Sequence, residues 1–177
     1  MIDPEFSRPV RIDSVGELPM AMVVAAEPGE RAALAKRFGL LALDRLEATL
    51  TLGRQGEEVT VHGTLQASVV QACVASGAPV PTTLAAPFDI LFRPQPDGRS
   101  PDEEIELGES ELDVVFYDKA EIDVGEAVAE TLALNLDPYP RAPDAEAALQ
   151  AAGVKREGEE ETGPFAALAA LKGKLKK

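Results

Sequence analysis

Hydrophobic and polar residues alternate with a period of two along the middle of the chain. Residues 46–53 place Leu or Ala at every second position between polar residues and Gly, and residues 58–73 continue this pattern after a short break. The break contains Gln55 and Gly56, and glycine readily adopts the positive φ that a tight turn requires. Two alternating runs around such a turn predict a β-hairpin with one buried face and one face in water.

Further runs extend the predicted sheet. Residues 84–92 alternate in the same way, and Pro87 on the polar face of this run predicts an edge position or a bulge, because proline has no N–H to donate to a neighbouring strand. A fourth short strand is expected at 111–117, and weaker strand patterns occur around 10–12 and 20–24. Most connections are short, so we expect an antiparallel sheet, which could close into a barrel-like form.

Three helices are expected beside the sheet, which makes the predicted fold class α+β. The first begins near Pro28 and ends at Gly39, since proline is favoured in the first turn of a helix and glycine just after its end. The second follows Asp123, a residue type that caps helices, and ends before Pro138. The third is expected over residues 143–152, which begin with proline and are rich in alanine.

The composition changes near the C-terminal end. Residues 154–163 are dominated by Lys, Arg, Glu and Gly, which is typical of a polar linker. Residues 164–177 place apolar residues at helical spacing and predict an amphipathic helix. We therefore expect a core domain at 1–153, followed by the linker and a tethered C-terminal helix. The apolar stripe of this helix consists of Phe165, Leu168, Leu171 and Leu175.

The net charge is −14, from 17 Lys and Arg residues against 31 Asp and Glu residues. Residues 97–130, here called the acidic segment, hold thirteen acidic residues and two basic ones. This balance argues against a surface that binds nucleic acid or anionic membranes throughout, because both are negatively charged. The acidic segment is interpreted either as a solvated loop or as a docking surface for a basic partner. Its candidate contacts are Glu103, Glu104 and Glu106.

Residues that could support catalysis are few. His62 is the only histidine and lies on the polar face of its predicted strand, while the lone Cys73 lies on an apolar face and is expected to be buried. A serine or cysteine nucleophile needs a base such as histidine, and no glycine-rich phosphate-binding motif is present. We therefore expect a non-enzymatic binding protein without catalytic residues, metal, other cofactor or small-molecule substrate.

The chain also lacks the pattern of an exported or membrane-spanning protein. Its first residues are acidic, with no secretory signal, and its best apolar run, residues 20–26, is far shorter than the roughly 20 residues that a bilayer span needs. A soluble cytoplasmic protein with no membrane partner is expected.

Four segments of the chain form a distinctive series. They are FSRPV at 6–10, VQACV at 70–74 with Pro79 after it, IDVGEAVAETLALNLDPYPR at 122–141, and PFAAL at 164–168 with Leu171 and Lys172. In this order and spacing they resemble the YceD family, the large ribosomal RNA subunit accumulation proteins, in a form like that of alphaproteobacterial members. The resemblance spans nearly the whole chain, and the part at 123–141 is the most specific.

The resemblance implies a role in making or maintaining large-subunit ribosomal RNA, without a known catalytic activity. It also suggests a partner, because family members are commonly encoded beside a small basic ribosomal protein of the large subunit. Many members carry two cysteines as Cys-x-x-Cys, whereas here Cys73 is followed by Ser76 at the second position. Since serine is not a thiolate ligand, a zinc or redox role is not carried over to this chain.

Two functional hypotheses follow. The first is a ribosome-biogenesis factor that binds a basic large-subunit ribosomal protein or a pre-ribosomal particle. The second is a direct RNA-binding protein that uses its basic C-terminal segment, and the net charge stands against it. An enzyme of unknown type is a third and weaker alternative. The C-terminal helix could instead pack on its own sheet or on a second copy of the chain. Its candidate partner contacts are Phe165, Leu168, Leu171, Lys172 and Lys174.

Overall fold

The structure is a computed structural model that describes residues 4–95, 113–117 and 120–154. At its centre is a long hairpin of β3 (Ala42–Gln55) and β4 (Glu58–Ala72), paired in antiparallel register with Leu50 opposite Gly63. The turn between them contains Gly56 at a φ of 64°. The hairpin predicted from the alternation is therefore confirmed, as is the need for glycine in its turn.

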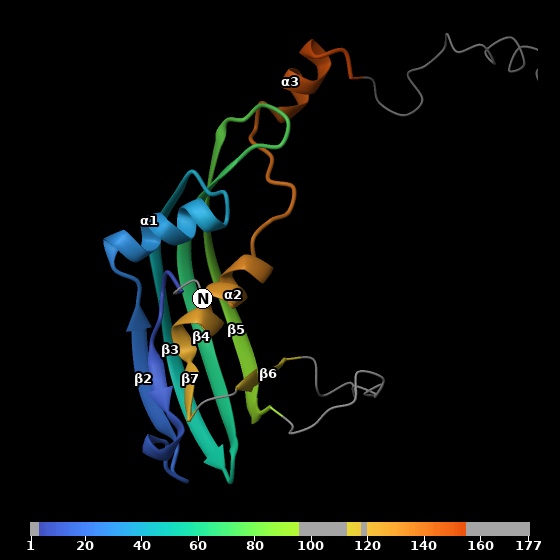
Figure 1. The fold of residues 1–177 in the computed structure, drawn as a ribbon. Coiled ribbons are helices and arrows are strands. Elements are labelled where there is room, and N and C mark those ends of the chain that lie inside the picture. The colour runs from blue at the N-terminus through green and yellow to red at the C-terminus, as the bar shows by residue number, and fades with distance from the viewer. Residues whose placement is uncertain (1–3, 96–112, 118–119, 155–177) are drawn as a thin grey trace, which may run out of the picture.

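The central hairpin belongs to a five-stranded sheet (Figure 1). Its strand order is β2-β3-β4-β5-β6, with β2 at Met20–Ala25, β5 at Pro79–Pro94 and β6 at Val114–Tyr117. Every neighbouring pair is antiparallel except β5 and β6, which are parallel. The α+β class and the mostly antiparallel sheet are confirmed. In the described part of the chain the sheet is open rather than closed into a barrel, with β2 and β6 at its edges.

The parallel pair departs from the antiparallel order expected from short connections. Parallel neighbours require a connection that returns the chain to the end from which it started. The segment between β5 and β6 is long enough for this return, unlike the two-residue turn between β3 and β4. β6 pairs only with Leu91–Pro94, so at Pro87 the described β5 has a partner on one side only, opposite Thr64. This arrangement fits the edge position expected for proline.

A second, two-stranded sheet joins the two halves of the chain. It pairs β1 (Pro9–Arg11) with β7 (Glu121–Asp123) in antiparallel register, with Val10 opposite Ile122. The short 3₁₀ helix η1 (Ile12–Ser14) follows β1. The sequence predicted a weak strand around 10–12 but not β7, in which Ile122 is the only apolar residue.

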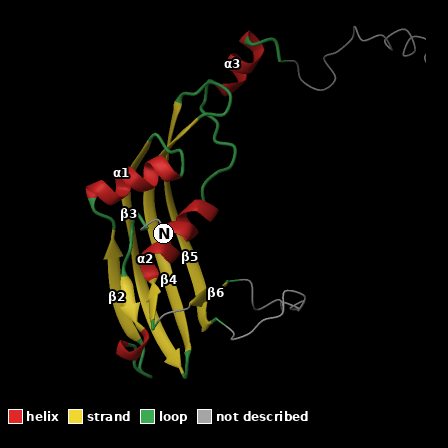
Figure 2. Cartoon of the chain, in the orientation of Figure 1, coloured by secondary structure: helices red, strands yellow, loops and turns green. Residues whose placement is uncertain are grey.

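The helices begin and end close to where the sequence places them. α1 (Pro28–Arg37) starts with its proline, and Gly39 follows it at a φ of 66°. α2 (Val124–Leu134) has Asp123 as its N-cap, and α3 (Ala145–Ala151) lies within the alanine-rich segment expected at 143–152. Figure 2 shows α1 and α2 against the sheet, and α3 beyond the end of the sheet at which β4 is connected to β5.

The main core lies between one face of the large sheet and the layer formed by α1, α2 and the two-stranded sheet (Figure 1). Alternate residues of the hairpin, such as Leu50 and Val61, are fully buried, while their neighbours Thr49 and His62 are exposed on the opposite face. The alternation therefore reflects one buried and one solvent-exposed face of the hairpin, as predicted. Among the described residues no helix is long and apolar enough to cross a bilayer. The linker and C-terminal helix expected beyond residue 154 lie outside the described residues, so that division of the chain stays a prediction.

Candidate partner-binding surfaces

The residues that the sequence selected as partner contacts all lie outside the described part of the structure. This applies to Glu103, Glu104 and Glu106 of the acidic segment. It applies equally to the C-terminal contacts, which are Phe165, Leu168, Leu171, Lys172 and Lys174. These assignments therefore stay predictions, and the surfaces described below are those of the remaining chain.

Asp123 joins two of the segments that carried the family resemblance. Its carboxylate accepts hydrogen bonds from the Ser7 hydroxyl at 2.5 Å and from the Arg8 backbone N–H at 2.7 Å. The same carboxylate accepts from the N–H groups of Gly125 and Glu126 at 3.0 and 3.2 Å and so caps α2. One side chain thus satisfies the free donors of a helix start and holds the N-terminal arm, residues 4–8, against it.

Gly125 allows the N-terminal arm to approach α2 closely. A Cβ at this position would lie 2.5 Å from the Phe6 carbonyl oxygen and 2.8 Å from the Arg8 nitrogen. Both atoms belong to backbone, which cannot swing aside as a flexible side chain can. φ at Gly125 is not positive, so its backbone conformation does not require glycine. The close packing against the N-terminal arm does.

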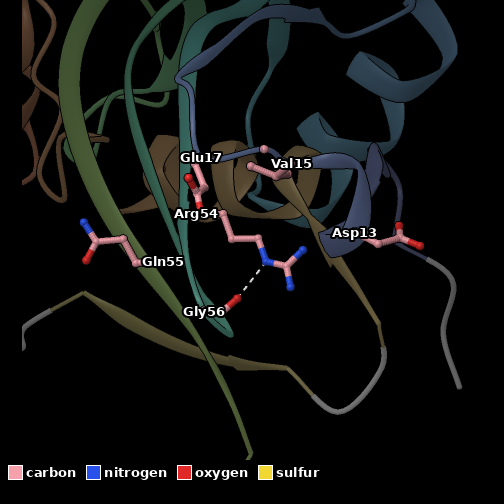
Figure 3. Close-up of a pocket in the computed structure, with 7 residues that line it drawn as sticks. Asp13, Val15, Glu17, Arg54, Gln55 and Gly56 are labelled. Atoms are coloured by element: carbon pink, nitrogen blue, oxygen red, sulfur yellow. Dashed lines mark hydrogen bonds between the residues drawn. The ribbon is translucent and has the colours of Figure 1, made fainter.

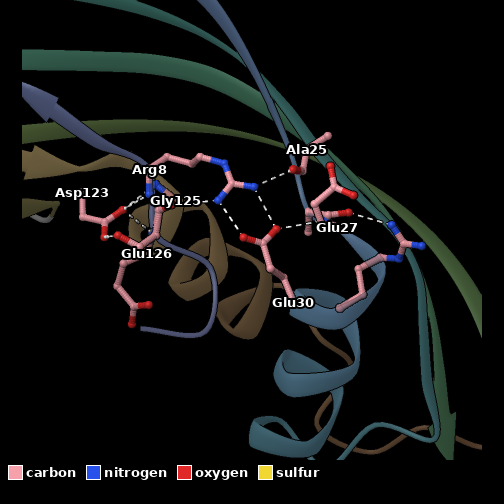
Figure 4. A network of polar contacts seen from close by, with 10 residues as sticks. Arg8, Ala25, Glu27, Glu30, Asp123, Gly125 and Glu126 are labelled. Carbon is pink, nitrogen blue, oxygen red and sulfur yellow. Dashed lines mark hydrogen bonds and ion pairs between the residues drawn. The ribbon is translucent and has the colours of Figure 1, made fainter. Parts of the chain in front are cut away.

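The Arg8 side chain extends this junction to α1 (Figure 4). Its guanidinium donates to both carboxylate oxygens of Glu30, at 2.7 and 2.8 Å, and to the Ala25 carbonyl at 3.0 Å. The hydrogen bond from Arg8 is the main cause that lowers the pKa of Glu30. Glu30 also accepts from the Glu27 N–H and completes a capping box at the start of α1.

Arg37 makes a similar connection near the C-terminal end of α1. It donates to Glu126 at 2.7 and 3.1 Å and to Glu5 at 3.0 Å, and the hydrogen bond to Glu126 is the main cause that raises its pKa. Arg8 and Arg37 therefore each have carboxylate partners within the chain. This cluster positions the N-terminal arm and the two helices, and does not present unpaired charge to a ligand.

Cys73 lies in a turn just beyond β4 and is 3% exposed, which confirms the burial expected of it. It belongs to a small separate cluster with Ala142 and Ala145. Backbone N–H groups, foremost that of Ala142, and Ser76 lower the pKa of the Cys73 thiol to about 7. The Ser76 N–H lies 3.4 Å from the sulfur, and the Ser76 hydroxyl donates to Asp144 at 3.3 Å. Within the described residues no group of three or more metal-ligating side chains comes together, here or elsewhere.

A polar hollow of about 560 Å³ lies at the opposite end of the sheet (Figure 3). Arg54 extends across it, donating to the Gly56 carbonyl at 2.7 Å and to the Ile12 carbonyl at 3.0 Å. Asp13, also on its wall, is paired with Arg11. Arg54 thus connects η1 to the β3–β4 turn, which is a structural contact.

A groove lies between α2 and the β5–β6 edge of the large sheet, with a volume of about 280 Å³. Phe88, Ile90 and Val115 contribute apolar lining, and Glu130 and Leu134 of α2 form part of its wall. None of these residues was among the candidate contacts predicted from the sequence, although Glu130 is one of the thirteen acids of the acidic segment. An apolar residue in a helix or strand usually belongs to the core, and only the packing shows that Leu134 remains 84% exposed.

His62 pairs with a single acidic residue on the surface of the large sheet. It is on the exposed face of the large sheet and pairs with Asp89 on the neighbouring strand. This placement agrees with the polar-face position expected from the alternation. Both side chains are exposed to solvent, and they line neither the groove nor the polar hollow.

Comparison with known proteins identifies one family. The family model described as large ribosomal RNA subunit accumulation protein YceD matches residues 61–172. This range begins in β4 and includes β5, β6, β7, α2 and α3. Neither the curated proteins nor the solved structures contain a match to the chain.

Proposed function

Because the chain belongs to the YceD family of large ribosomal RNA subunit accumulation proteins, we propose that it supports ribosome biogenesis by binding a basic large-subunit ribosomal protein or a pre-ribosomal particle. The family match over residues 61–172 is the observation that carries this proposal, since it implies a role in the accumulation of large-subunit ribosomal RNA. We propose further that the protein acts without catalysis and in the cytoplasm, where ribosomes are assembled.

The charge of the chain supports a protein partner that is basic. With a net charge of −14, the molecule as a whole attracts cations and repels the phosphates of RNA. The acidic segment concentrates this charge, and Glu103, Glu104 and Glu106 are its proposed contacts. Opposite charges on two partners accelerate their encounter and contribute less to the final affinity.

The C-terminal segment is proposed as a second contact. Its stripe of Phe165, Leu168 and Leu171 is suited to a groove on the partner, and Lys172 and Lys174 to nearby phosphates. A short isolated helix is marginal in water and gains stability when its apolar face is covered. The proposal thus assigns protein recognition to the acidic segment and particle docking to the C-terminal segment.

A charge reversal tests the role of the acidic segment. The partner is first identified by co-purification from cells and mass spectrometry, and its association rate with the purified chain is then measured by stopped-flow fluorescence. Changing Glu103, Glu104 and Glu106 to lysine should lower the rate at low salt by about tenfold or more and flatten its salt dependence. The binding of purified large-subunit ribosomal RNA is measured in parallel.

The matched control changes three exposed acids elsewhere, Glu17, Asp44 and Glu57, to lysine and so alters the net charge equally. An unchanged rate in the first variant, or an equal loss in both variants, would show that Glu103, Glu104 and Glu106 make no specific contact with the partner. Tight binding to ribosomal RNA in the absence of any protein would instead favour the direct RNA-binding hypothesis.

A truncation tests the C-terminal segment. Removal of residues 162–177 should leave the melting temperature within a few degrees of the parent while association with ribosomal particles is lost. The expectation follows from the polar linker, because a tethered helix contributes little to the core. Differential scanning calorimetry and sedimentation with ribosomal particles measure the two effects. A large drop in melting temperature would place the apolar stripe in the core and contradict the docking role.

A further inference from the structure

The groove between α2 and the β5–β6 edge combines an apolar surface with acidic side chains. Phe88 and Ile90 of β5 and Val114 and Val115 of β6 are among its apolar lining residues. Leu134, on the α2 side, keeps 84% of its surface exposed. Leu134 lines the same groove as these apolar residues, and contiguous apolar surface of this kind, unlike a single exposed side chain, marks an interaction site.

Two carboxylates line the same groove, those of Asp113 and Glu130, and no lysine or arginine is among its described lining residues. The carboxylate of Glu130 makes no hydrogen bond or ion pair with a described residue. Glu130 is exposed, but partial burial of its carboxyl is the main cause that raises its pKa, and the nearby Glu126 adds to the effect. Arg37 opposes this only through longer-range attraction, because its guanidinium is held by Glu5 and Glu126. Among the described residues, Glu130 therefore has no ion-pair partner of its own.

We propose that this groove binds an amphipathic segment of a partner protein, whose apolar side chains cover Leu134 and whose lysine or arginine pairs with Glu130. Charge complementarity selects this occupant, because an RNA phosphate would face two carboxylates and a second copy of the chain would bring a further net charge of −14. The inference rests on the proposed function for the source of the partner, a basic ribosomal protein. It adds the place and the chemistry of the contact.

A defined peptide tests the groove without knowledge of the natural partner. The probe is a fluorescein-labelled peptide of about 14 residues, built only from leucine and lysine with the leucines at helical i, i+3 and i+4 spacing. A peptide with glutamate in place of every lysine is the charge control. Binding to the full chain is measured by fluorescence anisotropy, and the methyl signals of Ile90 and Val115 are followed by NMR. The leucine–lysine peptide should bind and shift these signals, and the leucine–glutamate peptide should do neither.

Variants at the rim locate the binding to the groove. Glu130→Lys and Leu134→Ser should each lower the affinity for the leucine–lysine peptide by about tenfold. The first replaces attraction by repulsion, and the second removes apolar contact. Glu57→Lys, which makes the same charge change on an exposed turn, should leave the affinity within about twofold. Both rim residues are exposed, and circular dichroism verifies the fold of each variant.

Several results would overturn the proposal. One is equal binding of the peptide to Glu130→Lys and Glu57→Lys, which would indicate only general attraction to an acidic protein. Another is a shift of the Ile90 and Val115 signals when Leu168→Asp and Leu171→Asp are introduced without any peptide, which would show that the chain's own C-terminal segment occupies the groove. A shift on dilution would indicate a second copy.

The failure of this inference is separable from that of the proposed function. If the peptide does not bind while the chain still co-purifies with a basic ribosomal protein, the proposed groove is not the contact site, and the proposed function is unaffected. If the peptide binds at the groove but no ribosomal protein or particle associates with the chain, the groove is a binding site but its partner is not a ribosomal protein.

Discussion

Substitution of Gly125 by alanine tests whether the N-terminal arm is held in place by close packing on α2. Two effects of the new methyl group oppose each other. Alanine is a better helix former than glycine by about 1 kcal/mol in a helix interior. Against this gain, the methyl carbon would lie 2.5 Å from the Phe6 carbonyl oxygen and 2.8 Å from the Arg8 nitrogen, so backbone must move.

The cost of that movement is the larger effect. Overpacking of a close contact costs about 1–3 kcal/mol. Displacement of the arm also weakens the bonds that Asp123 accepts from Ser7 and Arg8, and a hydrogen bond to a charged group contributes about 1.5–3 kcal/mol. After the gain in helix propensity, we expect a net loss of about 1–3 kcal/mol. For a chain of this size that corresponds to a decrease in melting temperature of about 2–12 °C.

Gly29→Ala is the matched control for this measurement. Gly29 is the second residue of α1, as Gly125 is of α2, but a Cβ at Gly29 meets nothing within 4 Å. Urea unfolding followed by circular dichroism gives the free energy of unfolding of both variants. Gly29→Ala should be neutral or slightly stabilising. If Gly125→Ala is as stable as Gly29→Ala, the arm is not packed as described and the reasoning is refuted.

Two further predictions concern the sheet and the Arg8 contact. Leu50→Asp should cost several kcal/mol because Leu50 is fully buried, whereas Thr49→Asp on the exposed face should change little; equal melting temperatures would show that the assigned faces are wrong. The lowered pKa of Glu30 means that its contribution to stability is present above its ordinary value of 4.5 and is lost as the pH falls through the lowered folded value. Urea unfolding across this range should therefore show the difference between the parent and Glu30→Gln shrinking as the pH falls below 4.5, and a constant difference would contradict the role of the Arg8–Glu30 pair.

The candidate surfaces depended on the tertiary structure to different degrees. Glu103, Glu104 and Glu106 were selected from charge density alone, and the C-terminal stripe from its spacing, so both stay predictions that binding experiments must test. Glu130 was one of the thirteen acids of the acidic segment, and nothing in the sequence distinguished it from the others or pointed to Leu134. Leu134 has the same chemical character as the buried Leu132 two positions earlier, and only the packing of α2 against the sheet distinguishes them.

The sequence by itself determined the features that depend on near neighbours in the chain. Alternation across residues 46–53 and 58–73 predicted the central hairpin, because only one face of the strands can be buried at that period. Pro28 and Gly39 predicted the limits of α1, since each acts on the backbone of its own turn. These signals are local, and the structure agrees with them.

The tertiary structure decided the features that join distant parts of the chain. Asp123 accepts a hydrogen bond from Ser7, a residue 116 positions away, and neither residue carries a local signal of the other. The parallel pairing of β6 with β5 and the groove beside it likewise depend on which elements meet in space. The physical reason is that the hydrophobic period of a helix or strand shows only which of its sides is buried. Which other element covers that side depends on how all the elements of the fold pack together.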